Sequence, residues 1–171
     1  MNVKFLNPFL EAVHEVLISE TGIDAIKGDL QLEKGPYLTD DITVIIALVG
    51  GVEGMVFYSL TKETSMSLVS KMMGEDITEF NTLAQSGIAE LGNVITGRAS
   101  VKLSVAGYEA TISPPTLVIG RGSQVSTLDC PRLIIPLSSN IGTITVHLAL
   151  RDGMNQGTKT AQIPVPAKPV I

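Results

Sequence analysis

The stretch from Glu79 to Leu103 has the length and the hydrophobic spacing of one long amphipathic helix. At about 100° per residue, its apolar residues fall between about 80° and 200° on a helical wheel that starts at Ser86. They are Phe80, Ala84, Gly87, Ile88, Leu91, Val94 and Ile95. We therefore expect this side to pack inward along the whole helix, with the rest of the chain arranged around it.

The opposite side of the same helix is polar. Its members fall near 0°, +40°, −20° and +20° on the wheel, within about 5°; they are Ser86, Glu90, Asn93 and Gly97. Glu90 and Asn93 are about 4.5 Å apart along the axis, so both can touch the same small target. An ordinary solvated face is the alternative interpretation. This face contains no Lys or Arg, and Gly97 leaves room for another molecule, which favours a binding surface.

Two other glycines in the helix, Gly87 and Gly92, each cost roughly 0.5–1 kcal/mol relative to Ala. We interpret them as positions where the helix packs closely against neighbouring elements.

The spacing Ser-x3-Glu-x2-Asn, written here as Ser86…Glu90-Leu91-Gly92-Asn93, resembles the signature of the CheC/CheX phosphatases of bacterial chemotaxis. Three more landmarks occur in the same order as in CheX. They are Gly50-Gly51-Val52-Glu53-Gly54 before a strand, Met72-Met73-Gly74 at the end of a helix, and Ile112-Ser113-Pro114-Pro115-Thr116 after the long helix. The resemblance covers roughly residues 3–150. The motif occurs once, which is closer to CheX than to CheC-like members, where two copies are expected.

The resemblance implies a substrate and roles for the motif residues. The substrate would be the phospho-aspartate of a response-regulator receiver domain such as CheY. Asn93 would orient the attacking water, Glu90 would pair with a lysine of the receiver, and Ser86 would add a supporting hydrogen bond. Gly97, one turn after Asn93, would leave room for the partner. The Mg²⁺ would belong to the receiver, so the chain would need no cofactor of its own.

The resemblance also implies a homodimer that pairs through its sheets, and the apolar run Leu133–Ile135 beside Pro136 is the candidate edge. Two alternatives remain open. The chain could be a receiver-binding module without catalysis, like the flagellar switch protein FliM, or an unrelated α/β domain.

The fold expected is α/β in the layered α+β sense, with one mostly antiparallel sheet and three helices. Besides the long helix, we predict a helix that starts at the cap Asn7 and Pro8, or one turn earlier because proline is tolerated in a first turn, and ends at Gly22. Another helix runs from its cap Thr61 to Met73, with Leu68, Val69, Met72 and Met73 facing the core. Thr78 is the predicted cap of the long helix. The predicted strands are 23–33, 42–49, 54–60, 109–113, 116–119, 123–127, 132–137 and 141–150. Alternation in the last strand predicts burial on one side, with His147 on the mixed face.

Composition limits the other classes of function. The chain has 171 residues, 44% of them hydrophobic, which suits one domain at 1–151 followed by a flexible tail at 152–171. No apolar run approaches the ~18–20 residues of a membrane span, and the N-terminus does not resemble a signal peptide. The net charge of −5 without a basic cluster argues against nucleic-acid binding. The single Cys130 fits a reducing cytoplasm, and with His14 and His147 it cannot supply a zinc site.

Overall fold

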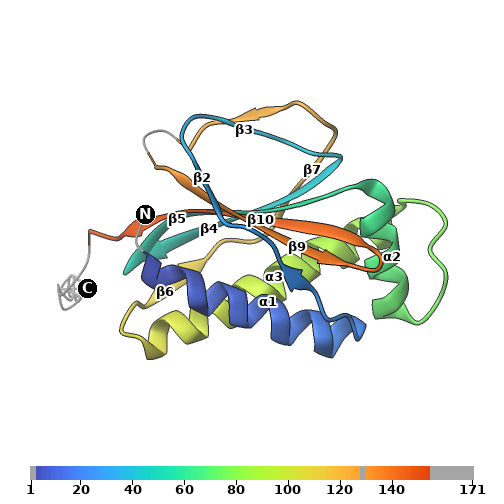
Figure 1. Cartoon of the computed structure of the whole chain (residues 1–171), viewed down its shortest axis with the longest axis horizontal. Coiled ribbons are helices and arrows are strands. Elements are labelled where there is room, and N and C mark those ends of the chain that lie inside the picture. The colour runs from blue at the N-terminus through green and yellow to red at the C-terminus, as the bar shows by residue number, and fades with distance from the viewer. Residues whose placement is uncertain (1–2, 128–129, 155–171) are drawn as a thin grey trace, which may run out of the picture.

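A computed structural model describes residues 3–127 and 130–154. An eight-stranded sheet forms the middle layer, and the helices lie together on one of its faces (Figure 1). A small two-stranded sheet of β3 (Tyr37–Leu38) and β8 (Gln124–Val125) covers part of the other face. The predicted class, a mostly antiparallel sheet packed with three α-helices, is therefore confirmed, and the small second sheet is an addition to it.

The main sheet has the strand order β1-β9-β10-β5-β4-β6. Its centre is the hairpin of β4 (Ile42–Gly50) and β5 (Val52–Leu60), followed by β10 (Gly142–Asp152) and β9 (Arg132–Ser139). Both β6 (Ala110–Ile112) and β7 (Thr116–Ile119) pair with β4, and every pairing is antiparallel. The hairpin turn requires glycine at residue 50, where φ is 137° and a Cβ atom would lie 2.7 Å from the Glu109 carbonyl oxygen.

The predicted strand 23–33 is wrong as a single element. It forms two short strands, β1 (Ile26–Lys27) and β2 (Gln31–Glu33), which both pair with β9. Between them the amide of Gly28 donates to the carbonyl oxygen of Pro136 at 2.8 Å. The run Leu133–Ile135 is therefore not a free edge, because β2 already pairs with it. The outermost backbone on this side belongs to β1 and β2, where Ile26 and Leu32 are exposed.

The helices are α1 (Leu6–Thr21), α2 (Lys62–Met73) and α3 (Thr82–Val105), and a 3-10 turn at Val3–Phe5 precedes α1. The predicted cap at Asn7 is wrong, because α1 takes no side-chain cap, but the alternative of an earlier start is confirmed, because helical backbone begins at Val3 and α1 itself at Leu6. In α2 the Thr61 side chain accepts from the Thr64 amide as predicted, but Met73 is exposed and not in the core. The long helix is capped by Asn81, whose side chain accepts from the Ala84 amide, and not by Thr78.

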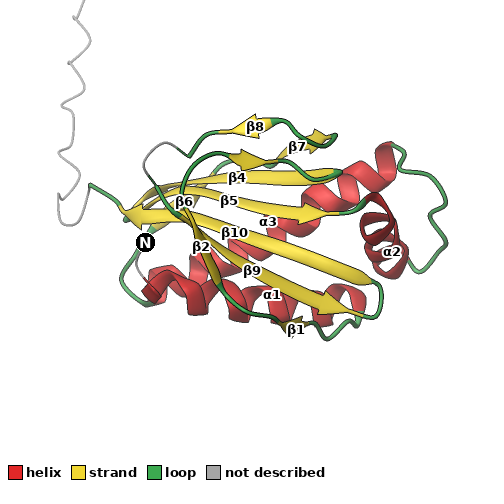
Figure 2. Cartoon of the chain, turned by 45° about the horizontal axis from the view of Figure 1, so that its top comes forward, coloured by secondary structure: helices red, strands yellow, loops and turns green. Residues whose placement is uncertain are grey.

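The main core lies between the helices and the sheet, where Phe9, Leu17, Ile46, Ile95 and Leu148 are fully buried or nearly so. Figure 2 shows α1 and α3 side by side against the sheet, with α2 beyond its far end. No helix within residues 3–127 and 130–154 has the length and apolar content needed to cross a membrane.

The second face of β10 is more buried than its sequence alternation predicts. His147 is only 8% exposed, and the Tyr37 ring from β3 lies 4.7 Å from it. Burial, with a smaller contribution from Arg132, lowers the pKa of His147 to about 4. The expected mixed face is therefore covered along this half of the strand, because the small sheet lies over it.

The C-terminal part of the fold continues slightly beyond residue 151. Strand β10 runs to Asp152, and the Gly153 amide donates to the Gly51 carbonyl oxygen at 3.0 Å. Most of the predicted tail, residues 155–171, lies outside the described residues.

Candidate functional site

The four predicted motif residues lie on one face of α3, the face turned away from the sheet. Ser86 and Glu90 are exposed, and Asn93 and Gly97 are partly exposed. We call these four residues the motif row. The structure brings all four together along about three turns of one helix, as the wheel predicts.

Glycine lets α3 approach its neighbours closely at two points. A Cβ atom at Gly92 would lie 2.9 Å from Val44 Cγ1 and 3.2 Å from Tyr58 Cδ2, both on the sheet. A Cβ atom at Gly87 would lie 3.1 Å from both methyl groups of Val69 on α2. The interpretation of these glycines as close-packing positions is therefore confirmed. Because Gly92 immediately precedes Asn93, the backbone of α3 lies tightly against the sheet at the turn that carries Asn93.

A buried hydrogen bond joins the same turn of α3 to the sheet. The hydroxyl groups of Tyr58 and Thr96 are 2.8 Å apart, and Thr96 also donates to the Gly92 carbonyl oxygen at 2.8 Å. Burial raises the pKa of Tyr58, so its hydroxyl is neutral. Sequence reasoning missed this pair. Helical spacing gave no signal for it, because Thr96 falls near 280° on the wheel, outside the predicted apolar arc.

The flank of α3 next to β6 is attached by a second hydrogen bond. Ser100 Oγ donates to the Ala110 carbonyl oxygen at 2.9 Å. Gly97 lies one turn earlier, and a Cβ atom there would meet only Ile112 Cδ1, at 3.9 Å. The space in front of Gly97 is therefore open, as the motif predicts.

The flank next to α1 holds the nearby cations. Lys102 Nζ lies 3.0 Å from Glu11 Oε2 and 2.7 Å from Glu15 Oε1, and Arg98 lies 3.9 Å from Glu15. These contacts raise the pKa of Lys102, and the hydrogen bond from Lys102 lowers the pKa of Glu15. Both cations are therefore drawn toward α1 and away from Glu90.

Within the described part of the chain, the side chains of Ser86, Glu90 and Asn93 have no hydrogen-bond or ion-pair partner. Glu90 offers carboxylate oxygens to a cation, and Asn93 offers both a donor and an acceptor. The described residues contain no group of three or more His, Cys, Asp and Glu side chains that could hold a metal. The motif row can therefore bind a cationic group and orient a small polar molecule, using atoms that nothing else in the described chain engages.

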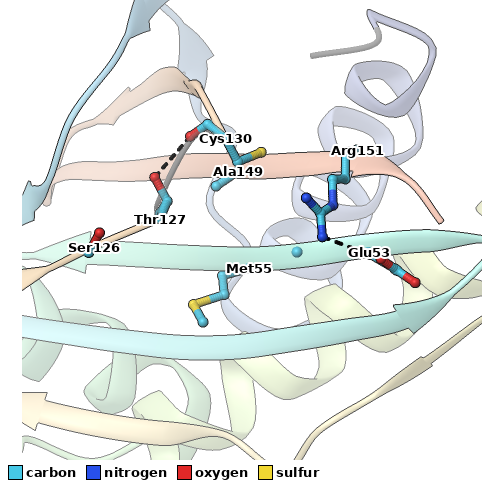
Figure 3. Close-up of a pocket in the computed structure, with 8 residues that line it drawn as sticks. Glu53, Met55, Ser126, Thr127, Cys130, Ala149 and Arg151 are labelled. Carbon is cyan, nitrogen blue, oxygen red and sulfur yellow. Dashed lines mark hydrogen bonds and ion pairs between the residues drawn. The ribbon is translucent and has the colours of Figure 1, made fainter. Parts of the chain in front are cut away.

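A pocket of about 260 Å³ lies on the other face of the sheet (Figure 3). Met55, Ala149 and Cys130 line it together with Arg151, which lies 3.7 Å from Glu53. None of the motif residues lines this pocket. The motif row thus lies outside this pocket, on an exposed helical face, which suits a protein substrate better than an enclosed small molecule.

Comparison with known proteins gives consistent matches. The sequence profile of the family "Chemotaxis phosphatase CheX" matches residues 42–138, more than half of the chain. The CheY-P phosphatase CheX of Thermotoga maritima is 29% identical over 157 residues, which are 90% of this chain and 99% of that protein.

Two solved structures extend the match to the fold. A CheC-like superfamily protein from Shewanella sp. PV-4 has a TM-score of 0.80 at 28% identity, covering 88% of this chain and 99% of that one. A chain of the CheX–CheY–BeF3–Mg complex from Borrelia burgdorferi has a TM-score of 0.76 at 26% identity, covering 88% of this chain and all of that one. The chain belongs to the CheX family of chemotaxis phosphatases.

Proposed function

We propose that this chain hydrolyses the phospho-aspartate of a CheY-type response-regulator receiver domain. The observation that carries the proposal is the pairing of Glu90 and Asn93 on one accessible helical face, with neither side chain engaged by another described residue. The Thermotoga maritima relative is named for this activity, and the Borrelia burgdorferi relative was crystallised with CheY.

Asn93 is the residue proposed to act on the reacting atoms. Its amide would lie beside the phosphoryl group, and its oxygen would accept a hydrogen bond from the attacking water. The water oxygen forms a bond to phosphorus in line with the breaking bond between phosphorus and the aspartate oxygen. The aspartate leaves as a carboxylate, and inorganic phosphate and a proton are released. An acyl phosphate hydrolyses spontaneously, so positioning alone gives useful acceleration.

Glu90 is proposed to fix the docked geometry. Its exposed carboxylate would pair with a lysine of the receiver, and such a charge-assisted contact is short and directional. Ser86, one turn earlier, would add a supporting hydrogen bond, and Gly97 would leave room for the partner's backbone. The Mg²⁺ that neutralises the phosphoryl group would be held by the receiver, so the chain itself would need no cofactor. The compartment we propose is the cytoplasm.

The test is phosphate release from a phosphorylated CheY-type receiver. Asn93→Ala should lower turnover about 100-fold or more while receiver binding stays nearly intact, by analogy with the loss of one preorganised donor. Glu90→Ala should weaken binding, and part of its lost activity should return at high receiver concentration. Asn140→Ala, at an exposed position in the β9–β10 turn, is the matched control and should behave as wild type.

Circular dichroism would establish that each variant is folded. Wild-type turnover in folded Asn93→Ala would refute the mechanism. Binding of the phosphorylated receiver without any phosphate release by the unmodified chain would leave a binding module and not an enzyme.

A further inference from the structure

Beside the motif row, α3 carries a second row of side chains that is apolar. On the wheel its members fall near 60°, 80°, 60° and 100°; they are Leu83, Val94, Val101 and Val105. We call them the apolar row. Val94 is partly buried against the core, whereas Leu83 is 43%, Val101 62% and Val105 88% exposed. An amphipathic helix that only had to fold would carry polar residues at these outward positions.

The outward surface formed by the two rows is depleted of charge. Glu90 is the one charged residue in the motif and apolar rows, all of which lie in the described part of the chain. The neighbouring cations Arg98 and Lys102 are turned toward carboxylates of α1. Valine also favours a helix less than alanine does, by several tenths of a kcal/mol. Neither helix formation nor solvation explains exposed valines at 101 and 105, whereas low charge with exposed apolar groups is typical of the core of a protein interface.

We propose that the apolar row is a docking surface for the receiver domain, so that the receiver covers the C-terminal half of α3 as well as the motif row. This proposal rests on the proposed function, which places the receiver at Glu90 and Asn93. Along the axis Val101 is about 12 Å and Val105 about 18 Å from Asn93. A circular interface of about 800 Å² per partner has a radius of roughly 16 Å, so one centred near Asn93 includes Val101 and ends close to Val105. The receiver should present an apolar, uncharged patch there.

The two rows then divide the work of binding. Glu90 provides one directional charge contact, which fixes orientation but contributes modest affinity when exposed to solvent. Val101 and Val105 provide apolar area that is removed from water in the complex. Loss of the apolar row should therefore raise KM and leave kcat nearly unchanged, because neither valine reaches the reacting atoms.

The experiment compares Val101→Gln/Val105→Gln with the unmodified chain. Affinity is measured for a CheY-type receiver held in its active form by beryllofluoride and Mg²⁺, which makes the measurement independent of turnover. We expect about tenfold weaker binding or more in the double variant, with phosphate release at saturating receiver within about twofold of wild type. Val49→Gln is the matched control. Val49 on β4 is 64% exposed, which is similar to the 62% of Val101, and it lies outside α3.

Unchanged affinity in the folded double variant would overturn the proposal. A change in self-association with unchanged receiver binding would also overturn it and would assign the apolar row to a second copy of this chain. If the unmodified chain binds the activated receiver but releases no phosphate, the proposed activity is refuted. The docking surface is then decided by the receiver affinity of the double variant alone. If the unmodified chain does not bind the receiver, both are refuted.

Discussion

Replacement of Gly92 by alanine should reduce turnover without changing any residue of the motif row. A methyl group there would lie 2.9 Å from Val44 Cγ1 and 3.2 Å from Tyr58 Cδ2, whereas carbon atoms pack at about 3.5–4.0 Å. The helix must therefore give way by roughly 0.5–1 Å at this point. If α3 turns about its axis to do so, the Cβ radius of about 3.3 Å makes the rotation on the order of 10–15°.

The same rotation moves the side-chain amide of Asn93 further than the backbone, because the amide lies further from the helix axis. This amide lies about 5–6 Å from the helix axis, so it would move by about 1 Å. A misplacement of this size at a reacting centre can cost about 100-fold in rate. We expect turnover to fall by roughly 10- to 100-fold, with receiver affinity much less affected. Overpacking should cost about 1–3 kcal/mol of stability, and alanine's helix propensity should return up to about 1 kcal/mol of it, so the variant should fold.

The assay is single-turnover phosphate release at saturating receiver, together with a binding titration and urea unfolding of each variant. Gly87→Ala is the control, because its methyl group meets Val69 on α2 at 3.1 Å and so imposes a comparable overpacking away from Asn93. Wild-type turnover in folded Gly92→Ala would refute the reasoning that the contact between α3 and the sheet aims Asn93. An equal loss in Gly87→Ala at equal stability would refute it as well.

Two further predictions concern the rest of the fold. His147 has a pKa of about 4 when folded and about 6.5 when unfolded, so the unfolded chain binds more protons between these values and stability falls as pH falls through this window. Between pH 7 and pH 5 the free energy of unfolding, measured with urea, should fall by about 2 kcal/mol more for the wild type than for His147→Leu. Parallel dependence of the two unfolding free energies on pH would contradict this. The predicted homodimer should pair through β1 and β2, the outermost strands, where Ile26 is exposed. Ile26→Lys should therefore lower the mass measured by light scattering toward that of the monomer. A monomeric wild type at roughly tens of micromolar would contradict the predicted dimer.

Local sequence patterns were sufficient where neighbouring residues decide the structure. The hairpin around Gly50-Gly51, the strand Thr116–Ile119 and the start of α2 at Thr61 follow from turn, strand and capping signals within a few residues. The common face of the motif row follows from helical periodicity alone. The start of α3 was misplaced because Thr78 and Asn81 are both good caps, and only the path of the preceding loop selects Asn81.

Contacts between distant segments were not predictable in the same way. The break at Gly28 depends on its pairing with Pro136, and the cover over His147 depends on the pairing of Tyr37 with Val125. Likewise, the bond between Tyr58 and Thr96 depends on how α3 is placed over β5, which no local spacing specifies. These failures share one cause: register between elements is set by tertiary packing and not by propensity.

The side chains of the motif row have no partner among the described residues, whereas the helix backbone beneath them packs tightly on the sheet. No described residue holds the side chain of Asn93, so the chain controls only where the backbone of that residue lies, and the docked receiver must select its rotamer. The position of the backbone is set from beneath, by the close contact at Gly92 and by the buried hydrogen bond between Tyr58 and Thr96. Substitutions on the inner face of α3 should therefore act mainly on turnover, as expected for Asn93→Ala, whereas substitutions at Glu90 and in the apolar row should act mainly on binding. In the proposed mechanism the catalytic parts are shared between two proteins, and this separation is expected because neither partner alone can preorganise the whole geometry.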